Sequence, residues 1–152
     1  MSLKIGKILL LVTDALLMLY WVAVAINMIP KESAFRDYTN PIMQAWNWSF
    51  FPLDLAASIF GFAGVYLVRI RHRIGWLILT IGLTLTFCAG FMAISFWAYY
   101  GDFNVSWWIS NALLMVVPAI VFAILVFDRA ASEEIASELR GRNVDSGIKE
   151  NA

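Results

Sequence analysis

The chain has 152 residues, of which 61% are hydrophobic and 14% are charged. Soluble domains contain about 45–50% apolar and about 25% charged residues, and a domain this small has too little interior to bury the excess. The composition therefore excludes an ordinary water-soluble fold and indicates a protein embedded in the lipid bilayer.

The formal net charge is zero, and the chain contains one Cys and one His. Without a basic excess there is no electrostatic reason to bind nucleic acid, so we predict no nucleic-acid partner. One Cys cannot form an internal disulfide, and with one His it offers no metal-binding cluster. We therefore expect no metal and no cofactor.

Four apolar segments are each long enough to cross the hydrocarbon core, which takes roughly 20 helical residues. We expect spans at about residues 5–29, 50–68, 75–99 and 107–127. Each segment is apolar around most of its circumference, as helices facing lipid are. The sequence predicts an all-α protein, an integral membrane four-helix bundle, with a transmembrane domain over residues 1–129.

Basic residues at the ends of these spans predict the orientation, because Lys and Arg concentrate in cytoplasmic loops. One side has Lys4, Lys7, Arg69, Arg71, Arg73 and Arg129, and the other has Lys31 and Arg36. We therefore expect a cytoplasmic N-terminus and a cytoplasmic C-terminus. The loops at 30–49 and 100–106 would face outward.

The tail from residue 130 to 152 is polar, in contrast to the spans. Ala131, Ile135 and Leu139 recur at helical spacing, which predicts a short amphipathic helix that ends at Gly141. The remainder is expected to be disordered. Two interpretations stay open: a solvated end of the last span, or a docking element for a membrane-protein partner.

The two halves of the chain share a pattern where the second and fourth spans begin. Residues 47–51 and 104–108 both read Asn-x-Ser-aromatic-aromatic, and Asp54 and Asn111 follow three residues after each motif. One interpretation is an internal duplication of two hairpins, related by an axis along the membrane normal. The other is that helix entries at the outer surface attract aromatic and capping residues independently.

Asp14 lies about three residues from the middle of the first span, or roughly 5 Å from the bilayer centre at the helical rise per residue. An ionised Asp at a helix centre costs on the order of 3 kcal/mol by insertion scales, so such residues face the bundle interior and have a partner or a proton. Thr80, Thr84 and Cys88 share one face of the third span and are the predicted partners. Asp14 is then either a ligand-binding or proton-relay carboxylate, or a protonated group that joins two helices.

Asp54 follows Pro52 near the predicted start of the second span. Its first interpretation is a helix cap, since carboxylates stabilise unpaired N–H groups at helix starts. Its second is a ligand-binding group in an outer pocket of rings and a few polar side chains, which is typical of small-molecule sites and suits an organic cation. The candidate ligand-binding residues are Asp14, Trp46, Asn47, Trp48, Asp54, Trp107 and Asn111.

Three segments of the chain resemble the YvaD-like family of uncharacterised small bacterial multi-pass membrane proteins. They are Asn40-Pro41-Ile42 with Trp46 to Asp54, then Leu85 to Gly90, and Asp102 to Trp108. The resemblance covers the four spans and leaves out the tail. It implies a multi-pass protein of the bacterial cytoplasmic membrane and implies no activity, so no catalytic residue is carried over.

Three functions compete at this stage. The favoured one is a binding protein or transport accessory that takes a lipid or small amphipathic molecule into the outer half of the bundle. The alternative is a regulatory or assembly subunit of a larger membrane complex, docked through the tail. The third is an intramembrane enzyme that uses Asp14 or Asp54. Joint use of the two as acid and base is disfavoured, because their predicted depths differ by more than about 10 Å.

Overall fold

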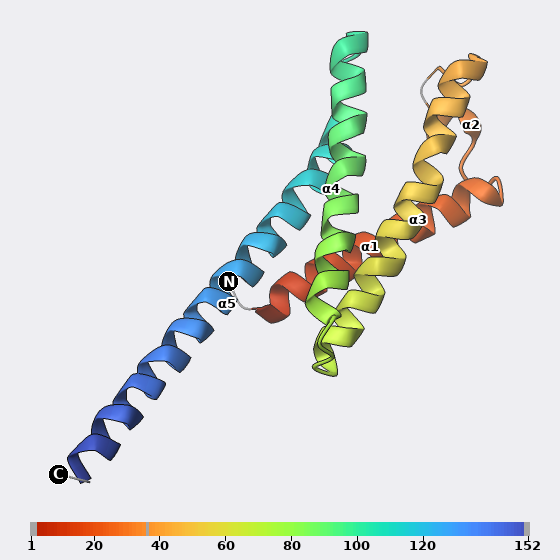
Figure 1. Cartoon of the computed structure of the whole chain (residues 1–152). Helices are drawn as coiled ribbons and strands as arrows, with labels where there is room; N and C mark the ends of the chain where they lie inside the picture. Colours follow the sequence, from red (N-terminus) through yellow and green to blue (C-terminus); the bar gives the residue numbers. More distant parts are fainter. Residues whose placement is uncertain (1–2, 36, 151–152) are drawn as a thin grey trace.

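The computed structural model describes residues 3–35 and 37–150, which form five helices and no strand. Side chains are described up to residue 128 (Leu3 excepted) and at a few positions of the tail. Four of the helices are long and apolar enough to cross a membrane, which confirms the predicted all-α four-helix architecture (Figure 1). The helices are α1 (Leu3–Ala25), α2 (Lys31–Ala34), α3 (Pro41–Arg69), α4 (Gly75–Tyr100) and α5 (Val105–Glu150).

Helix α1 ends at Ala25, earlier than the expected end of the first span at Ile29. Asn27 takes a left-handed conformation with φ 56°, and the amide of Met28 donates to the carbonyl of Ala23 at 2.8 Å. This is a common way to end a helix, and Asn tolerates the left-handed conformation better than most residues do. The first helix therefore ends about one turn earlier than expected, and the chain turns there before it enters α2.

Helix α3 begins at Pro41, nine residues before the expected start of the second span at Phe50. The side chain of Asn40 accepts a hydrogen bond from the amide of Ile42 at 3.0 Å, and Pro41 occupies the first turn, where its missing N–H costs nothing. Asp54 consequently lies more than three turns inside the helix. The capping interpretation of Asp54 is wrong, because no unpaired helix-start amide lies near it.

Helix α5 starts after a sharp turn and is the longest element. Gly101, with φ 79°, ends α4 in the left-handed conformation that Gly adopts without steric cost. From Val105 the helix continues through Gly141, where the sequence predicts an end, and reaches Glu150. Figure 1 shows this part of α5 extending away from the other helices.

The helices pack in chain order, so that α1 and α4 each contact α3 and α5. At the α3–α4 link the two helices touch backbone to backbone. A Cβ added at Gly64 would lie 2.5 Å from the Cα of Leu79, and one added at Gly82 would lie 2.7 Å from the amide nitrogen of Gly61. Stripes of small residues allow this close approach in lipid, where packing drives helix association.

Two apolar clusters stabilise opposite ends of the bundle. Near the α3–α4 link, Leu10, Leu79, Leu83, Val121 and Leu125 pack together. At the other end, α2 is held against α1 by a second cluster. Its buried members are Trp21, Val24, Ala34 and Phe35. We call the first end, with the α3–α4 link, the basic end, and the second, with α2 and the α4–α5 link, the aromatic end.

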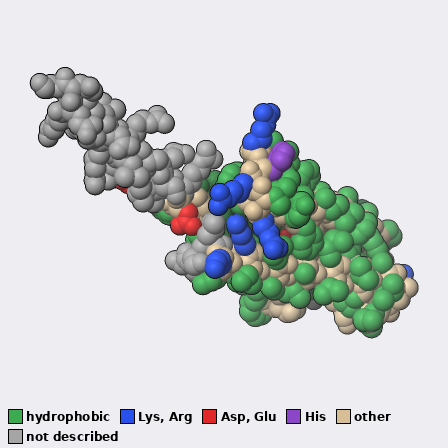
Figure 2. All heavy atoms as spheres, turned by 90° about the horizontal axis from the view of Figure 1, so that it is seen from below, with side chains coloured by type: hydrophobic (Ala, Val, Ile, Leu, Met, Phe, Trp, Pro, Cys, Tyr) green, Lys and Arg blue, Asp and Glu red, His purple; other side chains and the backbone are tan. Residues whose placement is uncertain are grey.

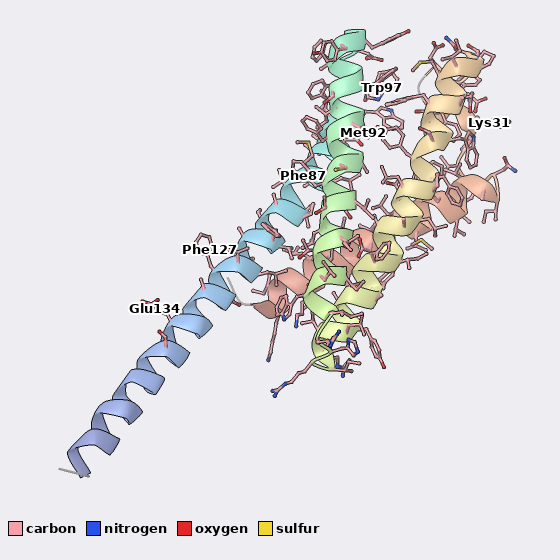
Figure 3. The ribbon with its side chains drawn as sticks, viewed as in Figure 1. Lys31, Phe87, Met92, Trp97, Phe127 and Glu134 are labelled. Atoms are coloured by element: carbon pink, nitrogen blue, oxygen red, sulfur yellow. The ribbon has the colours of Figure 1, made fainter. Side chains whose placement is uncertain are left out.

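Charge and apolar surface are distributed as in a membrane protein. Figure 2 shows Lys and Arg side chains gathered on the basic end, seen from below, with hydrophobic side chains covering much of the flank. Large apolar residues on all four spans are exposed, among them Leu19, Phe62, Leu77 and Ile109. Figure 3 shows Lys31 at the start of α2 and Glu134 on the extension of α5, on opposite sides of the bundle.

Candidate functional site

A cavity of about 550 Å³ lies in the aromatic end, between α1, α3, α4 and α5, with α2 beside it. Its size falls within the range of roughly 300–1,000 Å³ that holds small organic ligands. Most of the lining is aromatic or aliphatic. The polar lining residues are Thr13, Ser33, Asn47, Asp54, Ser106, Ser110 and Asn111.

The structure brings five of the seven candidate ligand-binding residues together around this cavity. They are Trp46, Asn47 and Asp54 from α3, and Trp107 and Asn111 from α5. These residues belong to the two repeated sequence patterns or lie beside them. Residues of both repeated patterns therefore line one shared space.

Trp48 is one of the two candidates that do not line the cavity. Its ring is 42% exposed and packs against Trp21, Phe35 and Phe51, with ring centroids 5.5, 5.8 and 6.2 Å away. Along a helix, successive residues point in directions about 100° apart, so residues two positions apart point in directions about 200° apart. Trp46 and Trp48 therefore cannot share one face, and Trp48 covers the outside of the α1–α3 interface instead.

Asp54 is the only carboxylate among the described residues that line the cavity. Its side chain is 6% exposed, and its Oδ2 accepts a hydrogen bond from the indole Nε1 of Trp21 at 2.8 Å. Its second oxygen, Oδ1, is buried and has no hydrogen-bond partner among the described residues. A buried acceptor without a donor costs free energy, so a donor that reached this oxygen would stabilise the folded protein.

Trp46 presents a second unused polar atom in the cavity wall. Its ring stacks on Phe96 with centroids 4.4 Å apart and meets the edge of Phe50 at 5.0 Å. These contacts hold the indole in place. Its Nε1 is buried, and none of the residues that the structure describes provides an acceptor for it. The residues of the wall therefore include an unsatisfied donor as well as an unsatisfied acceptor.

Several other polar groups of the wall donate hydrogen bonds to backbone carbonyls. The side-chain amide of Asn111 donates a hydrogen bond from Nδ2 to the backbone carbonyl of Trp107 at 2.8 Å. The hydroxyl of Tyr20 donates to the carbonyl of Ala34 at 2.9 Å, which ties α2 to α1 beside the cavity. Trp97 closes the side formed by α4, and Figure 3 shows it directed toward α3.

Asp14 does not line the cavity, although Thr13 and Leu17 next to it on α1 do. The side chain is fully buried and lies directly against Gly61 of α3, where an added Cβ would overlap its carboxyl group. Ser58 donates to the backbone carbonyl of Asp14 at 3.3 Å. Both carboxyl oxygens of Asp14 are without a hydrogen-bond partner among the described residues.

The predicted partners of Asp14 were wrong. Thr80, Thr84 and Cys88 make no hydrogen bond to its carboxyl group, and the hydroxyl of Thr84 donates to the carbonyl of Thr80 instead. The physical reason is space: Asp14 turns toward α3, where Gly61 leaves room for a carboxyl group.

Trp21 is the site residue that sequence reasoning missed. It orients Asp54 and lines the cavity. A signal was available, because Asp14, Leu17 and Trp21 recur at intervals of three and four residues and so share one face of α1. Because Asp14 indicates that this face of α1 is buried, Trp21 on the same face was a candidate partner for Asp54.

The chain matches the model of a family of unknown function (DUF5360) over residues 6–132. The chain belongs to this family. Over 120 residues it is 41% identical to "Uncharacterized protein YvaD" of Bacillus subtilis (strain 168), an alignment that covers 79% of this chain and 90% of that protein. No solved structure matches the chain.

These findings confirm the resemblance seen in the sequence. The match to this family of unknown function takes in all the residues that line the cavity and leaves out most of the tail. The cavity thus belongs to the part of the chain that the family model describes.

Proposed function

We propose that the protein binds a lipid or another small amphipathic molecule in the cavity at its aromatic end, as a binding protein or transport accessory. One observation carries the proposal: side chains from all four spans surround a cavity of about 550 Å³ that holds a carboxylate with a free oxygen. Apolar walls with a few convergent polar groups are the usual make-up of a small-molecule site.

The proposed setting is the bacterial cell membrane, with both termini in the cytoplasm. The Lys and Arg residues gathered at the basic end support this orientation (Figure 2), since such residues concentrate on the cytoplasmic side. The similar protein comes from a bacterium, which supports a bacterial membrane as the setting. In this orientation the cavity lies in the outer half of the bilayer, where lipids and amphipathic molecules arrive from outside.

The proposal is tested by thermal unfolding of the purified protein in lipid nanodiscs across a panel of lipids and small amphipathic molecules. A ligand that binds only the folded state stabilises it by about 2.7 kcal/mol at a concentration of 100 Kd. We therefore expect at least one member of the panel to raise the Tm. Quenching of tryptophan fluorescence by the same compound would place it near the indole rings of the wall.

A blocking variant makes this test specific to the cavity. Ala93 lines the cavity from α4, so A93F should fill the space and abolish the rise in Tm. The matched control is A123F, since Ala123 is exposed on α5 and is not a lining residue. Equal ligand stabilisation of A93F and A123F, or no stabilisation of the wild-type protein by any compound, would refute the proposal.

A second candidate function is a regulatory or assembly subunit. It is favoured by one observation: α5 continues from the end of its span at Asp128 to Glu150 as a single helix. Such an extension can dock a partner at the cytoplasmic surface. Deletion of residues 130–152 should then release co-purifying membrane proteins, and an unchanged set of co-purifying proteins would eliminate this candidate.

The geometry gives little support to an intramembrane enzyme that uses both carboxylates. The carboxyl group of Asp14 lies against Gly61, and Gly61 is seven residues from Asp54 on the same helix. That spacing separates the two groups by about 10 Å along α3. Only Asp54 reaches the cavity, so one substrate could not contact both groups.

A further inference from the structure

We propose that the ligand of the cavity is a hydrophobic amine whose ammonium group binds Asp54. This inference rests on the proposed function above and names the chemical class of the ligand. It follows from the two polar atoms that the cavity wall leaves unsatisfied, and from the absence of any compensating positive charge among the described lining residues.

The first step concerns charge. Of the described residues that line the cavity, none is Lys, Arg or His. An ionised carboxylate in such surroundings is costly unless it is paired with a positive charge and hydrogen-bonded. The indole N–H of Trp21 satisfies Oδ2 of Asp54 and leaves Oδ1 without a donor. A ligand ammonium group supplies what is missing, namely a positive charge and an N–H donor directed at that oxygen.

The second step concerns orientation. Trp21 is buried, and its ring lies 5.3 Å from both Tyr20 and Phe51 between ring centroids. Its hydrogen bond therefore fixes Asp54 in one position before a ligand arrives. A preorganised carboxylate spares the ligand the cost of ordering it. The aromatic walls further favour a cation, because the faces of indole and phenol rings attract positive charge.

The third step concerns the shape of the ligand. The unsatisfied N–H of Trp46 needs an acceptor, and Trp46 precedes Asp54 by eight residues of α3. That spacing is about 12 Å along the helix, with Trp46 nearer the aromatic end. The preferred amine therefore reaches inward to Asp54 and carries an oxygen acceptor, such as a hydroxyl or an ether, nearer the mouth. Its apolar body lies between the rings.

The experiment uses octylamine, octanol and octanoate, three compounds with the same chain and different head groups. The Tm of the full-length protein in nanodiscs is measured against each, together with quenching of tryptophan fluorescence. We expect octylamine to bind at least tenfold more tightly than octanol, and octanoate to bind most weakly. This comparison needs only the wild-type protein, so it remains decisive even where a variant fails to fold.

Two variants assign the effect to one carboxylate. D54N should bring the affinity for octylamine down to that for octanol, because it removes the charge and keeps the size of the side chain. D14N is the matched control, since Asp14 is also a buried carboxylate on the α1–α3 interface but does not line the cavity. Octylamine should bind to D14N as it binds to the wild-type protein.

The outcomes separate this inference from the proposed function. Equal binding of octanol and octylamine, or tighter binding of octanoate, would overturn the cation inference and leave a cavity that binds amphipathic molecules. Loss of octylamine binding in D14N but not in D54N would also overturn it. Failure of all three compounds and of the whole lipid panel would refute the proposed function itself.

Discussion

The two ends of the bundle are built on opposite packing principles. At the basic end, Gly61, Gly64 and Gly82 let α3 and α4 touch through their backbones. At the aromatic end, the stacked rings of Trp46 and Phe96 stand between the same two helices. Residue size therefore changes along this helix pair. Glycine, which has no side chain, lies between the helices at the basic end, and tryptophan, which has the largest side chain, lies between them at the aromatic end. The cavity is a geometric consequence, because helices pinned at one end and wedged at the other diverge.

The two buried carboxylates show the same contrast. Asp14 is packed against Gly61 and does not line the cavity. Asp54 lies on the same α1–α3 interface, but it borders the cavity and is oriented by Trp21. One interface therefore contains a closed site and an open one. The tests below perturb each end and ask whether the two respond differently.

The largest effect is expected from a side chain at the backbone contact of the basic end. In G64L the new Cβ would lie 2.5 Å from the Cα of Leu79, so the helices must separate. Overpacking typically costs about 1–3 kcal/mol and occasionally more, and contact with a backbone puts this variant at the upper limit. We expect little folded protein, measured by size-exclusion chromatography and thermal unfolding.

The matched control is G6A, because an added Cβ there meets only side chains of α5, at 3.7 Å or more. Its Tm should equal or exceed that of the wild-type protein. A normal Tm for G64L would show that α3 and α4 are not in backbone contact.

A smaller effect is expected where Gly61 meets Asp14. G61A places a methyl group on the carboxyl group of Asp14 and should lower stability by about 2 kcal/mol. The double variant G61A/D14A should recover part of the loss, with a coupling of about 1 kcal/mol. D14N keeps the size of the side chain and should give no recovery. Additive effects of G61A and D14A would mean that the two residues are not in contact.

Loss of the hydrogen bond at the aromatic end should cost somewhat less. W21F leaves the carboxylate of Asp54 without its donor, and an unsatisfied buried group costs about 1–3 kcal/mol. W48F is the control, because the ring of Trp48 is 42% exposed and packs without this bond. We expect a clear fall in Tm for W21F and a shift of less than about 0.5 kcal/mol for W48F. Similar shifts for both would indicate that ring packing, not the bond, decides stability.

The smallest change in stability is expected from filling the cavity. A93F adds a ring to open space and should leave unfolding within about 1 kcal/mol of the wild-type value, since it need not displace packed groups. Ala57 is fully buried and does not line the cavity, so the same substitution there should destabilise strongly. Thermal unfolding of A93F and A57F compares them directly, and equal losses would mean that the space beside Ala93 is occupied by packed protein.

The sequence predicted four long apolar helices correctly, because long apolar runs are a strong local signal. It placed the start of α3 too late, since residues 41–49 include Gln44, Asn47 and Ser49 and look like a loop by hydropathy alone. The capping pair Asn40-Pro41 was the better signal, and overlooking it produced the wrong role for Asp54. The capping residues indicate where this helix starts better than average hydropathy does.

The candidate site residues were brought together in part, for a similar reason. Five of the seven candidates line the cavity, because the two Asn-x-Ser-aromatic motifs mark residues that enter the bundle at the same end. The partner of Asp54 lies on α1, 33 residues away in sequence, and such a contact depends on how α1 is rotated against α3. The helical face of Asp14 can be predicted from one sequence, but the neighbour that this face meets cannot.

The length of α5 has a mechanical consequence. The helix contributes Trp107 and Asn111 to the cavity and runs on to Glu150. From Pro118, which is buried in the bundle, the arm to its far end is about 48 Å long at 1.5 Å per residue. A tilt of about 5° around that pivot would displace the end by about 4 Å, given the same rise per residue. A molecule that enters the cavity and shifts α5 slightly would therefore cause a larger displacement at the far end of the helix. A protein in the water phase could detect that displacement.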